Sequence, residues 1–111
     1  MKIQHENYDQ LTVLTLDGDF VADQVERFQK VADERIAEDI RDFVVDVAKM
    51  EFIDSRGLES LLWLQEVSGE RLGQVRLANT QENVAKILEI TRLASRIDSH
   101  PDVDSAIKSL R

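Results

Sequence analysis

The apolar residues of this chain change their spacing several times, from the alternation typical of strands to the three- and four-residue spacing typical of helices. Apolar runs predict strands at 2–5, 11–16, 43–47 and 74–77, and a short strand near 96–97 is left open. Helical spacing predicts helices at about 22–38, from 58 onward, at about 79–93 and after Pro101. Because strands and helices alternate after an initial hairpin, the pattern predicts an α/β domain with largely parallel strand pairing.

The stretch 43–67 contains a predicted strand, a loop and a helix in succession. Its first part is an apolar run with β-branched residues, which is typical of a buried strand. Its last part places leucines at helical spacing, which predicts a helix with a broad core-facing arc formed by Leu58, Leu61, Leu62 and Leu64. The loop between them, 53–57, has the sequence Ile-Asp-Ser-Arg-Gly.

That loop supplies candidate capping residues for the helix. Asp54 or Ser55 can accept a hydrogen bond from a free backbone N–H of the first turn. Gly57 permits a close approach of the backbone, or leaves room for a partner to approach. We therefore expect the Ser55 hydroxyl to be exposed at a helix N-terminus, where the helix dipole favours negative charge.

Trp63 lies on roughly the opposite side of this helix from the leucines, among glutamates. Two explanations remain open for a large aromatic residue in such a place. Either a terminal helix or a loop covers the indole, or the indole contacts a partner protein or a second copy of the chain, a role in which tryptophan is favoured.

The next helix carries a predicted capping box. Asn79 and Glu82 have the spacing at which two side chains cap each other's backbone N–H groups. Beyond them, apolar residues recur at helical spacing and predict a buried face.

Composition indicates one globular domain over residues 1–111. Hydrophobic residues make up 42% of the chain and charged residues 32%, which suits a soluble protein. The absence of cysteine excludes disulfides and is compatible with the cytoplasm. We expect no secretory signal and no membrane insertion, because no run approaches the roughly 20 apolar residues of a spanning helix. The formal net charge of −8 disfavours binding to nucleic acid or anionic lipid.

No motif of a catalytic or metal site stands out. The chain has no Gly-rich loop ending in Lys-Ser/Thr, no His-Glu-x-x-His and no Gly-x-Ser-x-Gly. Asp17, Asp19 and Asp23 superficially have calcium-loop spacing, but alanine takes the sixth position and phenylalanine the twelfth. We therefore expect neither enzymatic activity nor a bound metal or cofactor.

The segment 50–58, Met-Glu-Phe-Ile-Asp-Ser-Arg-Gly-Leu, resembles the motif of STAS domains, the sulfate-transporter and anti-sigma-factor-antagonist family. In that family an apolar strand is followed by Asp-Ser, a small residue and Gly-Leu opening a helix. Residues 79–93 are similar to the family's later helix, and residues 16–20 resemble its Gly-Glu-Leu-Asp turn. The resemblance implies one STAS-like α/β domain, a mixed sheet of four or five strands with an N-terminal hairpin and packed helices.

The resemblance also implies a function. In the bacterial antagonists of this family, a partner kinase that doubles as an anti-sigma factor phosphorylates the serine after the Asp, and Ser55 occupies that place. The chain would thus act in signal transduction and transcription regulation in the cytoplasm, binding an anti-sigma factor or serine kinase until Ser55 is phosphorylated. The expected partner-binding residues are Asp19, Asp54, Arg56, Gly57, Leu58 and, from its exposure on the helix, Trp63.

Two positions depart from the family pattern and favour an alternative. Arg56 stands where the family usually has a small residue, and Val21 stands where its first turn commonly ends in Asp. The alternative is a STAS adaptor or scaffold subunit of a transport or sensing complex, which uses the same surface without phosphorylation. A homodimer remains open for either function.

Overall fold

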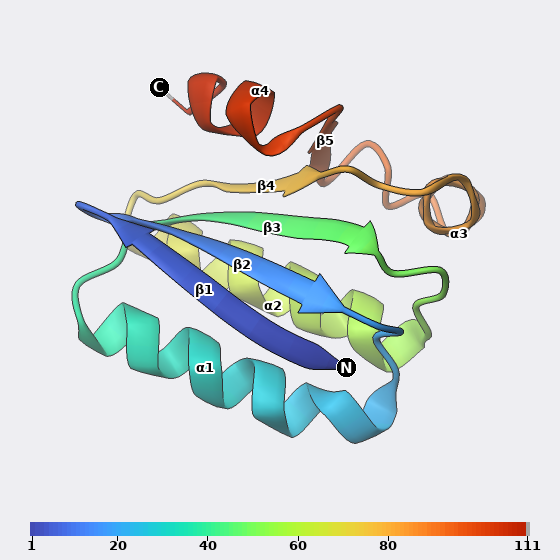
Figure 1. Cartoon of the computed structure of the whole chain (residues 1–111), viewed down its shortest axis with the longest axis horizontal. Coiled ribbons are helices and arrows are strands. Elements are labelled where there is room, and N and C mark those ends of the chain that lie inside the picture. Colours follow the sequence, from blue (N-terminus) through green and yellow to red (C-terminus); the bar gives the residue numbers. More distant parts are fainter. Residues whose placement is uncertain (111) are drawn as a thin grey trace.

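The computed structural model describes residues 1–110 as a sheet flanked by helices (Figure 1). The strands are β1 (Lys2–Tyr8), β2 (Leu11–Asp17), β3 (Asp42–Lys49), β4 (Val75–Ala78) and β5 (Asp98–His100). The helices are α1 (Val25–Ala37), α2 (Ser55–Glu70), α3 (Glu82–Ile90) and α4 (Val103–Lys108), with a short 3₁₀ helix η1 (Ala22–Gln24) before α1. No helix within residues 1–110 is long and apolar enough to cross a bilayer.

The sheet joins one antiparallel hairpin to a series of parallel pairs. Its strand order is β1-β2-β3-β4-β5. β1 and β2 pair antiparallel, with Lys2 opposite Asp17 and Tyr8 opposite Leu11, and each later pair is parallel. Because parallel neighbours need a crossover connection, α1, α2 and α3 alternate with the strands. The predicted mixed α/β sheet with an N-terminal hairpin is confirmed.

The two faces of the sheet carry cores of different size. In Figure 1, α1 and α2 lie below the sheet, and α4 lies above it beside β4 and β5. The main core includes Phe20, Phe28 and Phe43 and the buried leucines of α2, whereas a small cluster containing Val44 and Ala106 packs under α4. Since each fully buried large apolar side chain contributes about 1.5–3 kcal/mol, the α1–α2 face supplies most of the hydrophobic stabilisation.

The predicted core-facing arc of α2 is present. Leu58, Leu61 and Leu64 are buried, and Leu62 is half-buried against the same cluster. This face holds α2 against the sheet. The helix begins shortly after the chain leaves the end of β3.

The capping box predicted at Asn79 is wrong. α3 begins at Glu82 with Gln81 as its N-cap residue, and Asn79 adopts a left-handed backbone conformation with a φ of 60°. Its side chain donates to the Asp46 carboxylate at 3.0 Å, and its backbone N–H donates to the His100 carbonyl at 3.1 Å. Asparagine tolerates the left-handed region, so Asn79 turns the chain at the end of β4 instead of capping α3.

Two smaller boundaries also differ from the sequence pattern. The last strand forms just after the predicted 96–97, at Asp98–His100. The first helix is divided, because Ala22–Gln24 forms a 3₁₀ turn before α1 begins at Val25.

Candidate functional site

The loops that follow β2 and β3 run side by side and are joined by backbone hydrogen bonds. The Phe20 N–H donates to the Phe52 carbonyl at 3.1 Å, and the Asp54 N–H donates to the Phe20 carbonyl at 3.1 Å. These bonds make an isolated parallel bridge between Phe20 and Ile53. Both apolar side chains of that bridge are buried, so this pairing extends the sheet beyond its strands and places the start of α2.

Asp19 reinforces the same pairing through its side chain. One carboxylate oxygen, Oδ1, accepts from the Glu51 N–H at 3.2 Å and from the Phe52 N–H at 3.1 Å. Such side-chain acceptors satisfy backbone donors that a loop would otherwise leave to water. Asp19 is exposed and therefore both orders the loop before α2 and remains accessible at its surface.

Asp54 is the N-cap residue of α2. Its Oδ1 atom accepts from the Gly57 N–H at 2.9 Å, and its Oδ2 atom accepts from the Ala22 N–H at 3.0 Å. The hydrogen bond from Gly57 is the main reason that the pKa of Asp54 lies below its ordinary value of 3.8, and the bonds from Ala22 and Arg56 N–H groups and the Arg56 charge add to it. The carboxylate is therefore ionised near neutral pH.

Ser55 is the first residue of α2 and is exposed. Of the two capping candidates, Asp54 performs the capping, and the Ser55 hydroxyl makes no hydrogen bond to another of the residues 1–110. A hydroxyl in this place is exposed to solvent, and the helix dipole favours an anion beside it.

Gly57 is required by a close approach inside the domain. A Cβ atom at this position would lie 2.4 Å from the Phe20 carbonyl oxygen and 2.8 Å from Ile53 Cγ1. Of the two readings of this glycine, the approach of the backbone is the one that the structure contains. Leu58 follows it into the core and is 6% exposed. Both residues therefore position α2, and their contact with a partner stays a prediction.

Arg56 and Glu59 form an exposed ion pair on the first turns of α2. The Arg56 Nε atom lies 3.6 Å from the Glu59 carboxylate, and the side chains are 61% and 70% exposed. Such exposed pairs contribute little to stability, because water and salt screen them. The guanidinium is accordingly available beside Ser55 and is not consumed by the Asp54 cap.

Trp63 is half-buried between two shallow depressions. One lies between α1 and α2 and includes Val25, Gln29 and Trp63; the other includes Trp63, Glu66 and Arg96. The indole packs partly against the main core. Neither depression is lined by a described residue of the terminal helix α4. Arg96, from the loop before β5, lines one of them together with Trp63. Cover by a later loop and contact with a partner therefore both stay predictions.

The sequence reasoning did not single out Phe52 as a surface residue. Its side chain is 48% exposed, although its N–H and its carbonyl are both held by the neighbouring loop. A large aromatic residue on a well-held loop next to Ser55 has little conformational entropy to lose on binding. Its place in the loop between β3 and α2 gave no periodic signal for exposure.

Metal binding has no assembled ligand set here. Within residues 1–110, no group of at least three His, Asp or Glu side chains is placed to hold an ion. Of the three aspartates with calcium-loop spacing, Asp17 lies 3.9 Å from Lys49 Nζ and Asp19 accepts from backbone donors.

Comparison with known sequences identifies the family of this domain. The family model of the STAS domain matches residues 2–106. A STAS-domain containing protein of Pseudomonas aeruginosa (strain UCBPP-PA14) is 40% identical over 58 residues. The match covers 52% of this chain and 57% of that relative, so the chain spans little more than half of the relative's length.

Solved structures share the whole fold at low sequence identity. An anti-sigma factor antagonist from Mycobacterium paratuberculosis is similar with a TM-score of 0.86 and 20% identity, over 99% of this chain and 93% of that one. A sulfate transporter family protein from Wolinella succinogenes is similar with a TM-score of 0.79 and 18% identity, over 91% and 84% of the two chains. These likenesses concern the fold. With a family model that matches nearly its full length, the chain belongs to the STAS domain family.

Proposed function

We propose that this STAS domain is an anti-sigma-factor antagonist that acts in a partner switch. The unphosphorylated chain binds an anti-sigma factor or related serine kinase in the cytoplasm, and phosphorylation of Ser55 releases that partner. The domain itself regulates by binding and performs no catalysis. One observation at the start of α2 supports this best: Asp54 caps the helix, and the Ser55 hydroxyl is left exposed.

The physical basis of the switch is the charge that phosphorylation adds. A phosphoserine carries about −1.5 to −2 charges at neutral pH. At the first residue of α2 the helix dipole tolerates this charge, so the domain stays folded. A partner packed against the uncharged hydroxyl would meet a bulky dianion beside the ionised Asp54, and repulsion and desolvation would disfavour the complex.

The contact surface in this proposal surrounds Ser55. It comprises the exposed side chains of Asp19, Phe52 and Arg56 and the accessible part of Trp63 further along α2. Asp54 supplies a negative charge at the centre of this surface. Gly57 and Leu58 lie beneath the surface and hold α2 in place. Phe52 and Trp63 are the expected energetic anchors, because desolvated aromatic residues dominate many protein interfaces.

A second candidate function is a phosphorylation-independent adaptor or scaffold in a transport or sensing complex. Two observations favour it: the exposed Arg56 beside Ser55, and the fold likeness to a sulfate transporter family protein. In that case the same surface binds its partner without any control by phosphorylation of Ser55.

Phosphotransfer separates the two functions. The purified chain is incubated with ATP and host lysate, and intact mass with site mapping follows. If the chain acts in a partner switch, we expect one added phosphate at Ser55, which Ser55→Ala should lack. Ser95 is an exposed serine in the loop before β5, and the control Ser95→Ala should retain the phosphate.

Binding is then compared between the unmodified chain and a chain carrying phosphoserine at position 55, installed during translation. The switch expects about a tenfold or greater loss of partner affinity on phosphorylation. Equal affinity of both forms, with a partner that also ignores Ser55→Ala, would support the scaffold instead.

A further inference from the structure

The strand β1 forms an outer edge of the sheet (Figure 1). Its only strand neighbour within residues 1–110 is β2, and the two strands pair along the whole of β1, from Lys2 to Tyr8. A strand with a single neighbour leaves the backbone N–H and carbonyl groups of its other side without a partner in the sheet. β1 is therefore a template on which a further strand can pair.

The hairpin determines which backbone groups of β1 point outward. Tyr8 and Leu11 flank a two-residue turn, and the pair that closes such a turn exchanges backbone hydrogen bonds. Because this pattern alternates, all the even-numbered residues of β1 direct their backbone groups toward β2. The odd-numbered residues Ile3, His5 and Asn7 direct theirs toward the open edge.

β1 lacks most of the features that prevent an edge strand from pairing. Proline, a β-bulge or a short length commonly protects such an edge, and so do charged side chains. β1 has seven residues, contains neither proline nor glycine, and pairs with β2 in a continuous register. Its lysine and its glutamate, Lys2 and Glu6, are both exposed. These two charges therefore decide which strand can pair with β1.

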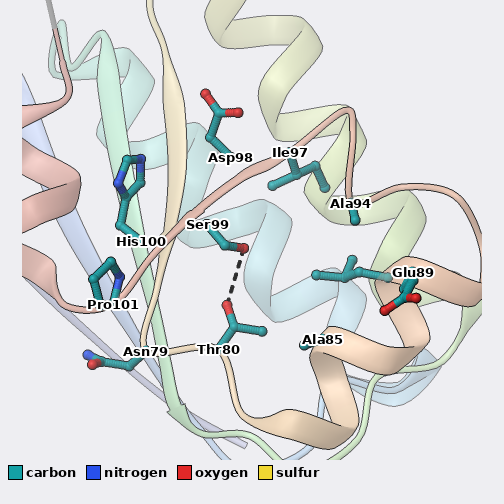
Figure 2. Close-up of a pocket in the computed structure, with 11 residues that line it drawn as sticks. Asn79, Thr80, Ala85, Glu89, Ala94, Ile97, Asp98, Ser99, His100 and Pro101 are labelled. Carbon is teal, nitrogen blue, oxygen red and sulfur yellow. Dashed lines mark hydrogen bonds between the residues drawn. The ribbon is translucent and has the colours of Figure 1, made fainter.

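The opposite edge of the sheet is less suited to a further strand. β5 has three residues, and Pro101, which follows it, has no N–H to donate. Figure 2 shows this segment beside a pocket of about 830 Å³ that lies between α3 and β5. An incoming strand would find few backbone donors there, so β1 is the better template.

The two charges of β1 complement each other across a two-fold axis. When two β1 strands pair antiparallel about Gln4, Lys2 of each copy lies opposite Glu6 of the other. In this register Ile3 and His5 exchange the backbone hydrogen bonds. Lys2 and Glu6 then form the non-hydrogen-bonded pairs, in which side chains lie closest together. Opposite charges in such cross-strand pairs stabilise a sheet, and like charges destabilise it.

We propose that β1 is the interface of a homodimer, in which two copies pair antiparallel about Gln4 and their sheets become continuous. A second copy is favoured over the strand of another protein, because it supplies the matching charges by symmetry. A contact through one strand of each copy buries little surface, so the dimer is weak and depends on concentration. The proposal does not depend on phosphorylation of Ser55.

Sedimentation equilibrium of the full chain tests the interface, at concentrations up to about 1 mM and low salt. The wild type is expected to show a monomer–dimer equilibrium. Lys2→Glu alone and Glu6→Lys alone each place like charges opposite one another in both symmetry-related places, and should weaken dimerisation about tenfold. An equimolar mixture of the two variants restores opposite charges in a heterodimer, and should associate at least as tightly as the wild type.

Controls on α3 change the net charge by the same amounts far from this edge. Lys86→Glu and Glu89→Lys are at exposed positions, and each should dimerise like the wild type. Hydrogen exchange by NMR locates the contact, since the Ile3 and His5 amides should exchange more slowly as the concentration rises while the Gln4 amide stays unchanged. A chain that is monomeric at every concentration would overturn the proposal, as would a dimer that ignores both charge reversals at β1.

Discussion

The Asp54 carboxylate is hydrogen-bonded to the backbone N–H of Ala22 at 3.0 Å, across 32 residues of sequence. Its other oxygen accepts from the Gly57 N–H in the first turn of α2. One side chain therefore caps the helix and ties it to the loop that follows β2. Because Asp54 satisfies these donors, the adjoining Ser55 hydroxyl is left at the surface.

Asp54 contributes stability that the domain loses at acidic pH. Its folded pKa lies below the ordinary value of 3.8, so its contribution is complete above that pH and is lost as the pH falls through the folded value. We expect Asp54→Asn to lower the melting temperature at neutral pH and to flatten the loss of stability on acidification.

Thermal unfolding from neutral pH down to about pH 3 measures this effect. Asp33→Asn, an exposed position on α1, is the matched control and should keep the wild-type pH dependence. The Asp102 cap of α4, whose pKa is also lowered by the Ser105 N–H, titrates in every variant. A wild-type slope in Asp54→Asn would contradict the role assigned to its carboxylate.

Gly57→Ala should destabilise the domain by about 1–3 kcal/mol, because the added methyl group has no space without backbone movement. The Phe20 carbonyl oxygen would lie 2.4 Å from the new Cβ atom. Gly69→Ala in the same helix is the control, since a Cβ there meets no atom within 4 Å.

The control should be more stable by about 0.5–1 kcal/mol, the usual gain of alanine over glycine inside a helix. Urea unfolding of both variants gives the two free energies. The assignment of Gly57 to a close approach fails if both substitutions stabilise the domain.

Asp19→Ala should loosen the loop before α2 without unfolding the domain. The Glu51 and Phe52 N–H groups lose their acceptor, so both amides should exchange with solvent faster. Hydrogen exchange by NMR measures this directly. Asp23→Ala, at an exposed neighbouring position in η1, should leave the exchange of the two amides unchanged. Unaltered exchange in Asp19→Ala would contradict the role of Asp19 as their acceptor.

Ser55→Asp should leave the fold intact. A negative charge at the first residue of α2 is favoured by the helix dipole, so the melting temperature should stay close to that of the wild type. The same substitution at Leu58, which is buried, should unfold the domain or lower its melting temperature strongly. A large loss of stability in Ser55→Asp would argue against a modification that acts on the partner alone.

Trp63 offers a readout of partner binding that needs no substitution. It is the single tryptophan of the chain and is half-buried at the surface of α2. If the proposed surface is used, binding removes water from the indole, and its emission should shift to shorter wavelength. An unchanged spectrum on saturation with the partner would place the contact elsewhere.

Periodicity alone was enough for the order of strands and helices except for the short strand β5, which it left open. The apolar run before Asp54 and the leucines after it have incompatible periods, so a turn between a strand and a helix was the one arrangement that buries both. The same local logic placed Ser55 at a helix N-terminus, since capping depends on residues that are close in sequence.

Long-range geometry decided the remaining features. Asn79 and Glu82 have the local spacing of a capping box, yet Asp46 on β3 provides a better partner for the Asn79 side chain. The choice between two roles for Gly57 required knowing that the Phe20 carbonyl lies against it. Likewise, the exposure of Phe52 and the pocket between α3 and β5 arise from how separate segments pack, and residues far apart in sequence carry no periodic signal of their contact.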